Sequence, residues 1–162
     1  MSEETWTQSG EAVTALILDV FRLNGQLLLA GDRLVAELGL TSARWQILGA
    51  IAYAERPESV AWHARKLGVH RQGVQRIVNE LKKEGIVELR PNPRHKRAHL
   101  VVLTPKGHRL FEDALALQIP WSNALSDGVS LDDLATTQEV VGRLRKRLEE
   151  ASVTQDQEFS QS

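Results

Sequence analysis

The chain has 162 residues, of which 42% are hydrophobic, with no cysteine and a formal net charge of −1. This length fits one compact domain with a folded core, and the lack of cysteine excludes disulfides, thiolate metal sites and a cysteine nucleophile. No apolar run approaches the roughly 18 residues of a membrane span, and the first 15 residues carry no Lys or Arg, so a cytoplasmic protein with no membrane association is expected.

The charge is unevenly distributed along the chain. Residues 56–109 hold 13 Lys and Arg but only 4 acidic residues, and they also hold all five histidines. The rest of the chain is net acidic. A basic segment between acidic parts indicates binding to a polyanion, although a solvated basic face that binds nothing has the same composition.

Two helices are predicted before the helix-turn-helix region. Apolar residues at steps of three and four over residues 13–38 predict a long amphipathic helix that Gly39 ends. Thr41 or Ser42 can cap a second helix, which must stop before Pro57.

The middle of the chain has the spacing of a helix-turn-helix. Ser59 begins a helix that runs through Leu67, and Gly68 ends it. After a turn of a few residues, apolar positions on one face predict a second helix over residues 70–84. Two short helices joined through a turn that contains glycine are typical of this motif.

A strand-like pattern follows the two helices. Residues 86–90 and 98–103 are predicted to form two strands, joined by a strongly basic loop over residues 91–97. The loop contains two prolines, which cannot donate ladder hydrogen bonds, so it should project from the sheet. A helix-turn-helix followed by a basic hairpin indicates a winged helix.

Two further helices are predicted after the hairpin. The Thr-Pro pair at residues 104–105 begins the first of them, and Pro120 should kink it. The second begins near Leu131 after an Asp-Gly break. Both polar ends of the chain, residues 1–11 and 152–162, are predicted to be flexible tails.

This order of elements resembles the MarR family of bacterial transcriptional regulators over residues 12–150. The resemblance rests on the helix-turn-helix sequence at residues 67–78, on the Glu-Gly-Ile-Val-Glu segment at 84–88, and on the Leu-Thr-Pro-Lys-Gly segment at 103–107. Their joint order and spacing carry the resemblance, since no single segment is specific.

The resemblance implies a mainly α fold with a small β-hairpin wing. The winged helix-turn-helix DNA-binding lobe should span about residues 41–104. Helices near both ends of the chain, at about residues 12–38 and 105–150, should form a dimerisation lobe. Their long apolar stripes agree with this, because one small lobe cannot bury them all.

Three histidines depart from the family pattern. His70 stands where the turn often has Ser, which is a better helix cap. His95 stands where the wing commonly has Asp, so the usual acid–arginine contact inside the wing is absent. His63 occupies a core position that is usually aliphatic, and a histidine bonded to a backbone carbonyl would fit there.

Candidate DNA contacts follow from the predicted helix over residues 70–84 and from the wing. Outward residues on the first two turns of this helix are expected to read bases: Arg71, Gln72, Gln75 and Arg76. By resemblance, Arg97 falls on the family arginine that enters the minor groove, and Arg94 and Lys96 should meet phosphates. Further phosphate candidates are Arg65, Lys66, Lys82, Lys83 and Arg90.

The resemblance also implies how such a protein works. It would be a homodimeric repressor that binds a pseudo-palindromic operator in double-stranded DNA and is released by a small, often aromatic or acidic, ligand. Candidate ligand residues are Trp45, Tyr53, Arg22 and His63, although the aromatic residues fit a plain core equally well. His63 could also make release sensitive to pH.

Other functions fit the sequence less well. No catalytic or nucleotide-binding motif is present, so neither an enzyme nor a cofactor is expected. His95, His99 and His108 could serve a metal-responsive regulator, but their spacing matches no standard site, so no metal is expected. A winged helix that contacts another protein stays open, because a fold does not fix a function.

Overall fold

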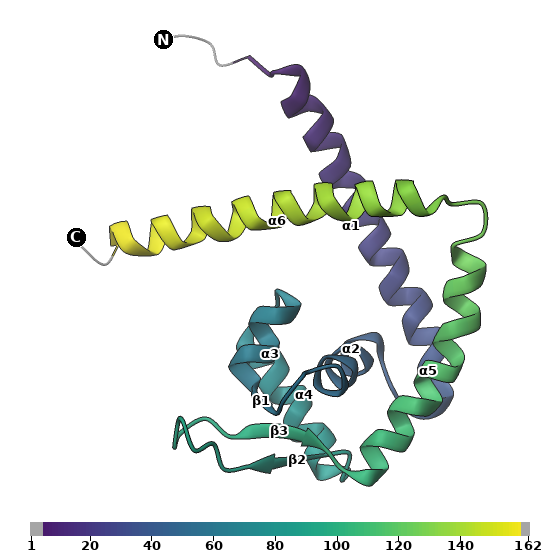
Figure 1. Cartoon of the computed structure of the whole chain (residues 1–162), viewed down its shortest axis with the longest axis vertical. Helices are drawn as coiled ribbons and strands as arrows, with labels where there is room; N and C mark the ends of the chain where they lie inside the picture. The colour runs from purple at the N-terminus through teal and green to yellow at the C-terminus, as the bar shows by residue number, and fades with distance from the viewer. Residues whose placement is uncertain (1–4, 160–162) are drawn as a thin grey trace. The chain divides into compact units, whose positions relative to one another are not determined.

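The computed structural model describes residues 5–159 of the chain, with side chains described through residue 151. It contains helices and one small antiparallel sheet with the strand order β1-β3-β2 (Figure 1). The chain forms two compact units, which meet in sequence between Pro120 and Trp121.

The first unit carries all the strands of the described chain. Its elements are α1 (Gln8–Val35), the 3-10 helix η1 (Ala36–Leu38), α2 (Ser42–Ala52), β1 (Glu58–Ser59), α3 (Val60–Leu67), α4 (Arg71–Lys83), β2 (Val87–Arg90), β3 (Leu100–Leu103) and most of α5 (Pro105–Leu125). The second unit holds the end of α5 and α6 (Leu131–Phe159). Every predicted helix and both predicted strands are therefore present.

The two terminal helices are longer than the sequence predicted. α1 begins at Gln8 rather than at Val13, because the Thr7 hydroxyl accepts a hydrogen bond from the Gly10 amide at 3.0 Å and caps the helix earlier. α6 continues to Phe159, since residues 151–159 contain neither Gly nor Pro that would end the helix. Helix thus extends into both segments that were expected to be flexible tails, whose outermost residues lie outside the described range.

α2 is the central helix of the winged-helix lobe, which we define as α2 through β3. It packs against α1, α3, α4 and β3, and Leu48 at its middle is fully buried. Further buried hydrophobic residues of the lobe come from α2, α3, α4 and the sheet region: Ile47, Ile51, Val60, Ala64, Val74, Ile77, Val78, Leu81, Ile86, Val87, Val101 and Leu103. Val35 of α1 and Ala114 of α5 belong to the same hydrophobic core.

The junction between α1 and α2 is fixed by polar contacts. The Ser42 amide donates to the Asp32 carboxylate at 2.6 Å, and the Ser42 hydroxyl donates to the Leu28 carbonyl at 2.7 Å. A side chain at Gly31 would collide with the Ser42 hydroxyl, so glycine at this position allows the close approach of the two helices. Thr41, rather than Ser42, caps α2.

The sheet positions the wing. β2 pairs with β3 in antiparallel register, with Val87 opposite Leu103 and Arg90 opposite Leu100, and the loop between them projects beyond the sheet (Figure 1). β1 was not predicted, because two residues are too few to show an alternating pattern. Its pairing with β3 ties the start of α3 to the wing.

Thr104 and Gly107 join the wing to α5. The Thr104 hydroxyl donates to the Gly85 carbonyl at 2.6 Å and accepts from the Gly107 amide at 3.1 Å, so it caps α5 as predicted. A side chain at Gly107 would collide with the backbone carbonyl of Ile86. α5 remains helical through Pro120, where a kink was expected.

α1 exposes large apolar side chains along most of its length. Phe21 is 68% exposed and Leu29 is 55% exposed. By length and composition the span Gln8–Leu38 is apolar enough to cross a membrane, with a mean hydropathy of 1.4 over its best 18-residue window. No membrane span was expected because no uninterrupted apolar run is long enough. α1 nevertheless has the composition of one, since its scattered polar residues leave the mean hydropathy of this window high. A helix covered by another protein surface has the same composition.

Candidate nucleic-acid interface

α4 has one apolar face and one polar face, as its spacing predicted. Val74, Ile77, Val78 and Leu81 are buried in the lobe, which turns the polar residues outward. His70 caps the helix without a side-chain hydrogen bond, in agreement with its weaker capping ability. The helix therefore presents a continuous polar surface on the side opposite the core.

A shallow groove of about 690 Å³ follows this polar surface. It is lined only by α4 side chains, among the described residues: Arg71, Gln72, Gln75, Arg76, Asn79, Glu80 and Lys83. All four predicted base-reading residues lie here together. Asn79 and Glu80 were missed, although each lies one helical turn after Gln75 or Arg76, and that spacing could have identified them.

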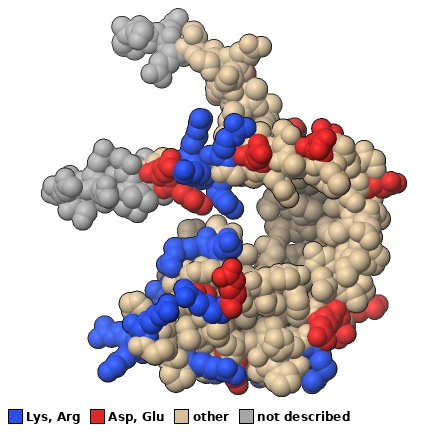
Figure 2. Space-filling model, viewed as in Figure 1, with Lys and Arg blue, Asp and Glu red and all other residues tan. Residues whose placement is uncertain are grey.

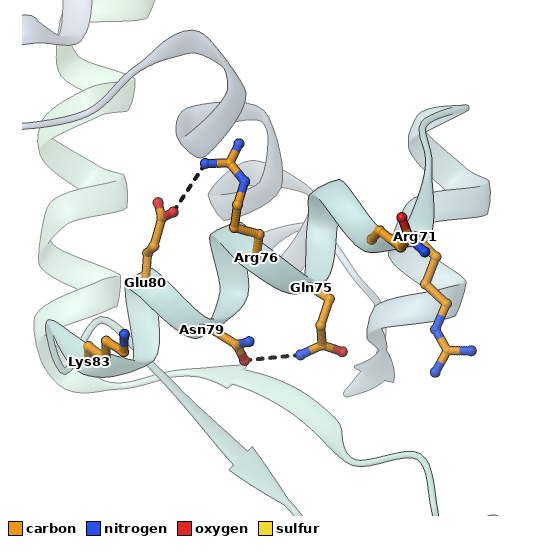
Figure 3. A pocket seen from close by; sticks show the side chains of 7 residues that line it. Arg71, Gln75, Arg76, Asn79, Glu80 and Lys83 are labelled. Atoms are coloured by element: carbon orange, nitrogen blue, oxygen red, sulfur yellow. Dashed lines mark hydrogen bonds and ion pairs between the residues drawn. The ribbon is translucent and has the colours of Figure 1, made fainter.

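Two side-chain pairs organise the groove (Figure 3). The Arg76 guanidinium donates to the Glu80 carboxylate at 3.2 Å, and the Gln75 amide donates to Asn79 at 3.1 Å. Arg71 points away from Arg76 in this view. The groove therefore contains one charged pair and one amide pair, each of which joins two consecutive turns of α4.

Arg71 also borders a second cleft, of about 90 Å³, between α4, the start of α3 and the wing. Gln75 of α4 and Arg97 and His99 of the wing region lie on the same cleft. Side chains of α4 and of the wing region thus meet at one place on the surface. Arg97 is the predicted minor-groove residue, and the structure brings it close to Arg71.

The wing itself is exposed and basic. Arg94 follows a turn in which its amide donates to the Asn92 side chain at 2.9 Å, and the Arg94 and Lys96 side chains are exposed. Figure 2 shows that Lys and Arg side chains gather on the side of the lobe that carries the wing. Arg90 pairs with Glu88 on β2 at 2.7 Å, so it is partly neutralised.

The C-terminal end of α4 is held by residues that the sequence did not single out. Arg44 of α2 donates to the Glu84 carboxylate at 2.6 Å and to the Gly39 carbonyl at 3.2 Å. Its side chain is only 16% exposed. Lys106 donates to the Glu84 carbonyl at 2.8 Å. These contacts link the end of α4 to the α1–α2 junction and to the start of α5.

The predicted phosphate candidates are divided between different surfaces. Lys83 lines the α4 groove, and Lys82 and Arg65 are exposed. Lys66 instead lines a hollow of about 490 Å³ on another part of the first unit. This second hollow is formed by α2, α3 and α5.

We call this second hollow the aromatic hollow, after its four aromatic residues: Trp45, Tyr53, Trp62 and Phe111. Tyr53 and Phe111 meet edge to face at 5.3 Å, and Tyr53 is 70% exposed, so it is not a core residue. Trp45 and Tyr53 were predicted ligand residues, whereas Trp62 and Phe111 were missed because they lie far away in sequence.

Two other ligand candidates do not line the aromatic hollow among the described residues. Arg22 is exposed on α1 and pairs with Asp19 at 3.1 Å. His63 is fully buried beside Trp62, and neither of its ring nitrogens has a hydrogen-bond partner of good geometry, although the Glu58 backbone lies near enough to favour the protonated ring. Burial lowers the pKa of His63, and this effect outweighs that of nearby Glu58, which favours the protonated ring.

The three histidines considered for metal binding do not come together. Within the part of the chain that the structure describes, no group of three or more His, Cys, Asp or Glu residues is placed to hold a metal ion. His99 borders the cleft beside the wing, while His108 borders a separate pocket near Arg56 and Arg90. The histidine-based alternative therefore gains no geometric support.

Comparison with known proteins agrees with this architecture. The sequence profile of the MarR family matches residues 38–98, which include the helix-turn-helix and most of the wing. The chain belongs to the MarR family. An uncharacterised protein of Mycobacterium bovis is 39% identical over 134 residues, which cover 83% of this chain and 92% of that protein. The transcriptional activatory protein BadR of Rhodopseudomonas palustris is 31% identical over 63% of this chain and 59% of BadR.

Solved structures of transcription regulators share the fold. The transcriptional regulator PA3341 is 28% identical with a TM-score of 0.72, covering 85% of this chain and 98% of that one. Mycobacterium tuberculosis MosR, solved in complex with DNA, has a TM-score of 0.70 at 21% identity, covering 83% and 96%. CouR of Rhodococcus jostii, bound to p-coumaroyl-CoA, has a TM-score of 0.63 at 22% identity, covering 80% and 86%.

Membership of the MarR family identifies the chain as a transcription regulator with a DNA-binding winged-helix fold, and not as an enzyme. Regulators of this family are soluble DNA-binding proteins, so the apolar character of α1 gives only weak support to a membrane span. A cytoplasmic location remains a prediction.

Proposed function

We propose that this MarR-family protein is a homodimeric, sequence-specific repressor that a small ligand releases from its operator. The observation that carries the proposal is the α4 groove, in which side chains able to read bases are held outward by a fully packed inner face. Helix α4 has 13 residues and is therefore about 20 Å long, a length that fits the major groove of DNA.

Two kinds of DNA contact are assigned to different residues. Arg71, Gln72, Gln75 and Arg76 read base edges, since Arg suits guanine and Gln suits adenine. Arg97 enters the minor groove, and its position at the cleft beside α4 supports simultaneous contact by wing and helix. Arg94 and Lys96, with the exposed Arg65, Lys82 and Lys83, bind phosphates and supply affinity without sequence preference.

Dimerisation is supported by the apolar surface of α1. Exposed apolar side chains along one helix favour burial against a second protein surface. A two-fold axis would place two α4 helices about 34 Å apart, one turn of DNA, on a pseudo-palindromic site. The terminal helices, at residues 8–38 and 105–159, form the dimerisation lobe in this proposal, and the winged-helix lobe binds DNA.

The aromatic hollow is the proposed ligand site. Its volume of about 490 Å³ suits a small molecule, and Lys66 is the one charged residue among its described lining residues. These features favour an aromatic compound with an acidic group. The bound p-coumaroyl-CoA of the similar protein CouR, which contains an aromatic acyl group, supports this class. A ligand between α2 and α3 would displace α3 and thereby the helix-turn-helix.

Fluorescence anisotropy with the full chain tests the proposal. Labelled DNA from upstream of the protein's own gene is compared with random DNA of equal length across a salt series. We expect preference for the upstream fragment and a steep loss of affinity with salt. Equal binding to both would contradict autoregulation, and no binding at low salt would contradict DNA recognition altogether. Adding aromatic carboxylates to the complex then tests release.

Two variants separate base contacts from phosphate contacts. Arg76→Ala should cost about 1–3 kcal/mol on the preferred fragment and relax base preference. Lys96→Ala should weaken binding to all sequences alike. It should also reduce the slope of the logarithm of the binding constant against the logarithm of salt concentration by about 1. Uniform losses for both variants would show that Arg76 does not read bases.

A further inference from the structure

The outward face of α4 carries one carboxylate that the DNA-binding role leaves unexplained. Glu80 is the single acidic residue among the 13 residues of α4, and its side chain lies in the groove at 41% exposure. A negative charge at this surface opposes the approach of phosphates and weakens binding to every DNA sequence. The buried face of α4 does not require it, because that face is entirely apolar.

Glu80 is paired with a proposed base-reading residue. Its carboxylate accepts one hydrogen bond from Arg76 at 3.2 Å (Figure 3). A guanidinium has five N–H donors in a planar fork, so this single bond leaves donors free on Arg76, whose side chain is 73% exposed. Glu80 therefore limits where the Arg76 fork can lie while leaving it able to bind a second acceptor.

We propose that Arg76 and Glu80 form one unit that selects neighbouring G·C base pairs, and that Glu80 is a specificity-determining residue. Arg76 donates to O6 and N7 of a guanine, and Glu80 accepts from the N4 amino group of a cytosine. Four residues along a helix rise about 6 Å, close to the roughly 6.8 Å between next-adjacent base pairs. This inference rests on the proposed function, because it requires α4 to enter the major groove.

The charge on Glu80 mainly lowers the affinity for DNA that lacks the matching cytosine. In the major groove, guanine and thymine present acceptors, which repel a carboxylate, and adenine places its N6 donor beside the N7 acceptor. Cytosine presents a donor alone, so it suits the Glu80 carboxylate best. On DNA that lacks this cytosine, Arg76 also stays engaged with Glu80 instead of a base. Glu80 thus lowers affinity for non-matching DNA more than for matching DNA, which increases the ratio between the two.

The experiment compares Glu80→Gln with Glu112→Gln in the full-length protein. Glu112 is exposed on α5 and does not line the groove, so its variant makes the same change in charge elsewhere. Sequencing of DNA selected from a random library gives the base preference. Anisotropy gives the selectivity ratio, which is the affinity for the preferred DNA divided by the affinity for random DNA. Glu80→Gln should bind random DNA several-fold more tightly and lose about tenfold in this ratio, the equivalent of one good base contact. Preference for cytosine at one position should shift towards adenine, which a Gln amide contacts through N6 and N7, whereas Glu112→Gln should retain the preference for cytosine.

A double variant tests whether the two residues act together. Adding Arg76→Ala to Glu80→Gln should reduce the ratio much less than Arg76→Ala does alone. Unchanged selectivity in Glu80→Gln would overturn the inference, as would equal losses on all DNA accompanied by a lower melting temperature, which would mean that Glu80 only stabilises α4. Absence of DNA binding by the unaltered protein would overturn the proposed function, and this inference with it.

Discussion

The winged-helix lobe and helix α1 use apolar residues in opposite ways. In the lobe, Leu48, Leu81 and their neighbours are fully buried within the same chain. On α1, Phe21 and Leu18 are at least half exposed, although α1 is as regular a helix as α4. The difference indicates that the apolar residues of the lobe are covered within the chain, whereas most of those on α1 need a second surface to cover them. Folding and assembly are therefore separable in this protein.

Removing a buried leucine from the lobe should have the largest effect. Leu48→Ala should lower the free energy of unfolding by roughly 2–5 kcal/mol, because it leaves a cavity at the centre of α2. Leu131→Ala, at a position that is 83% exposed at the start of α6, should change it by less than about 0.5 kcal/mol. Urea denaturation measures both variants. Similar losses would contradict the separation between the buried core and the exposed terminal helices.

A charge on α1 should affect assembly rather than folding. Phe21→Glu should raise the dimer dissociation constant at least about tenfold, since it places a carboxylate in an apolar contact surface. Sedimentation equilibrium measures the constant, and circular dichroism checks that helix content is kept. Gln26→Glu adds the same charge at a polar position of α1 and serves as the control. A protein that is monomeric at all concentrations would contradict the assignment of α1 to a dimer.

Acid should weaken the lobe through His63, and this is the smallest of the three effects. Burial lowers the pKa of His63 in the folded protein, so the unfolded chain binds the proton more readily. The contribution of neutral His63 to the free energy of unfolding is then fully present above about pH 6.5. It is lost as the pH falls below this value, by at most about 1.4 kcal/mol per pH unit. Urea midpoints at pH 7.5 and 5.5 should differ more for the natural protein than for His63→Leu.

An exposed histidine provides the control for this pH dependence. His108→Gln should behave like the natural protein, since it removes an exposed histidine of α5 and leaves the buried His63 in place. Equal pH dependence in His63→Leu and the natural protein would show that His63 is not the titrating group.

The helices and the outward face of α4 could be predicted because both depend on local patterns. Apolar spacing on residues 70–84 determines which side of α4 packs inward, and therefore which residues face out. Gly39 and Gly68 end their helices in the left-handed conformation, as glycine at those positions predicted. The two-residue strand β1 could not be predicted, because it exists only through pairing with β3.

Other features depend on residues that are distant in sequence. Trp62 and Phe111 join Tyr53 in the aromatic hollow only because α3 and α5 pack beside α2. Arg44 reaches Glu84 across 40 residues of sequence, and nothing in the local pattern of α2 indicates that partner. Likewise, the complete burial of His63 without a hydrogen bond is a result of packing from several elements.

By itself, the sequence determined the order of elements, the basic winged helix and the outward residues of α4, because helix and strand periodicity act over a few residues. The tertiary structure alone decided where Lys66 lies, which aromatic residues share a hollow, and that Arg44 of α2 contacts Glu84 at the end of α4. Those properties depend on side-chain direction and on contacts between separate elements, which a linear pattern of residue types does not specify.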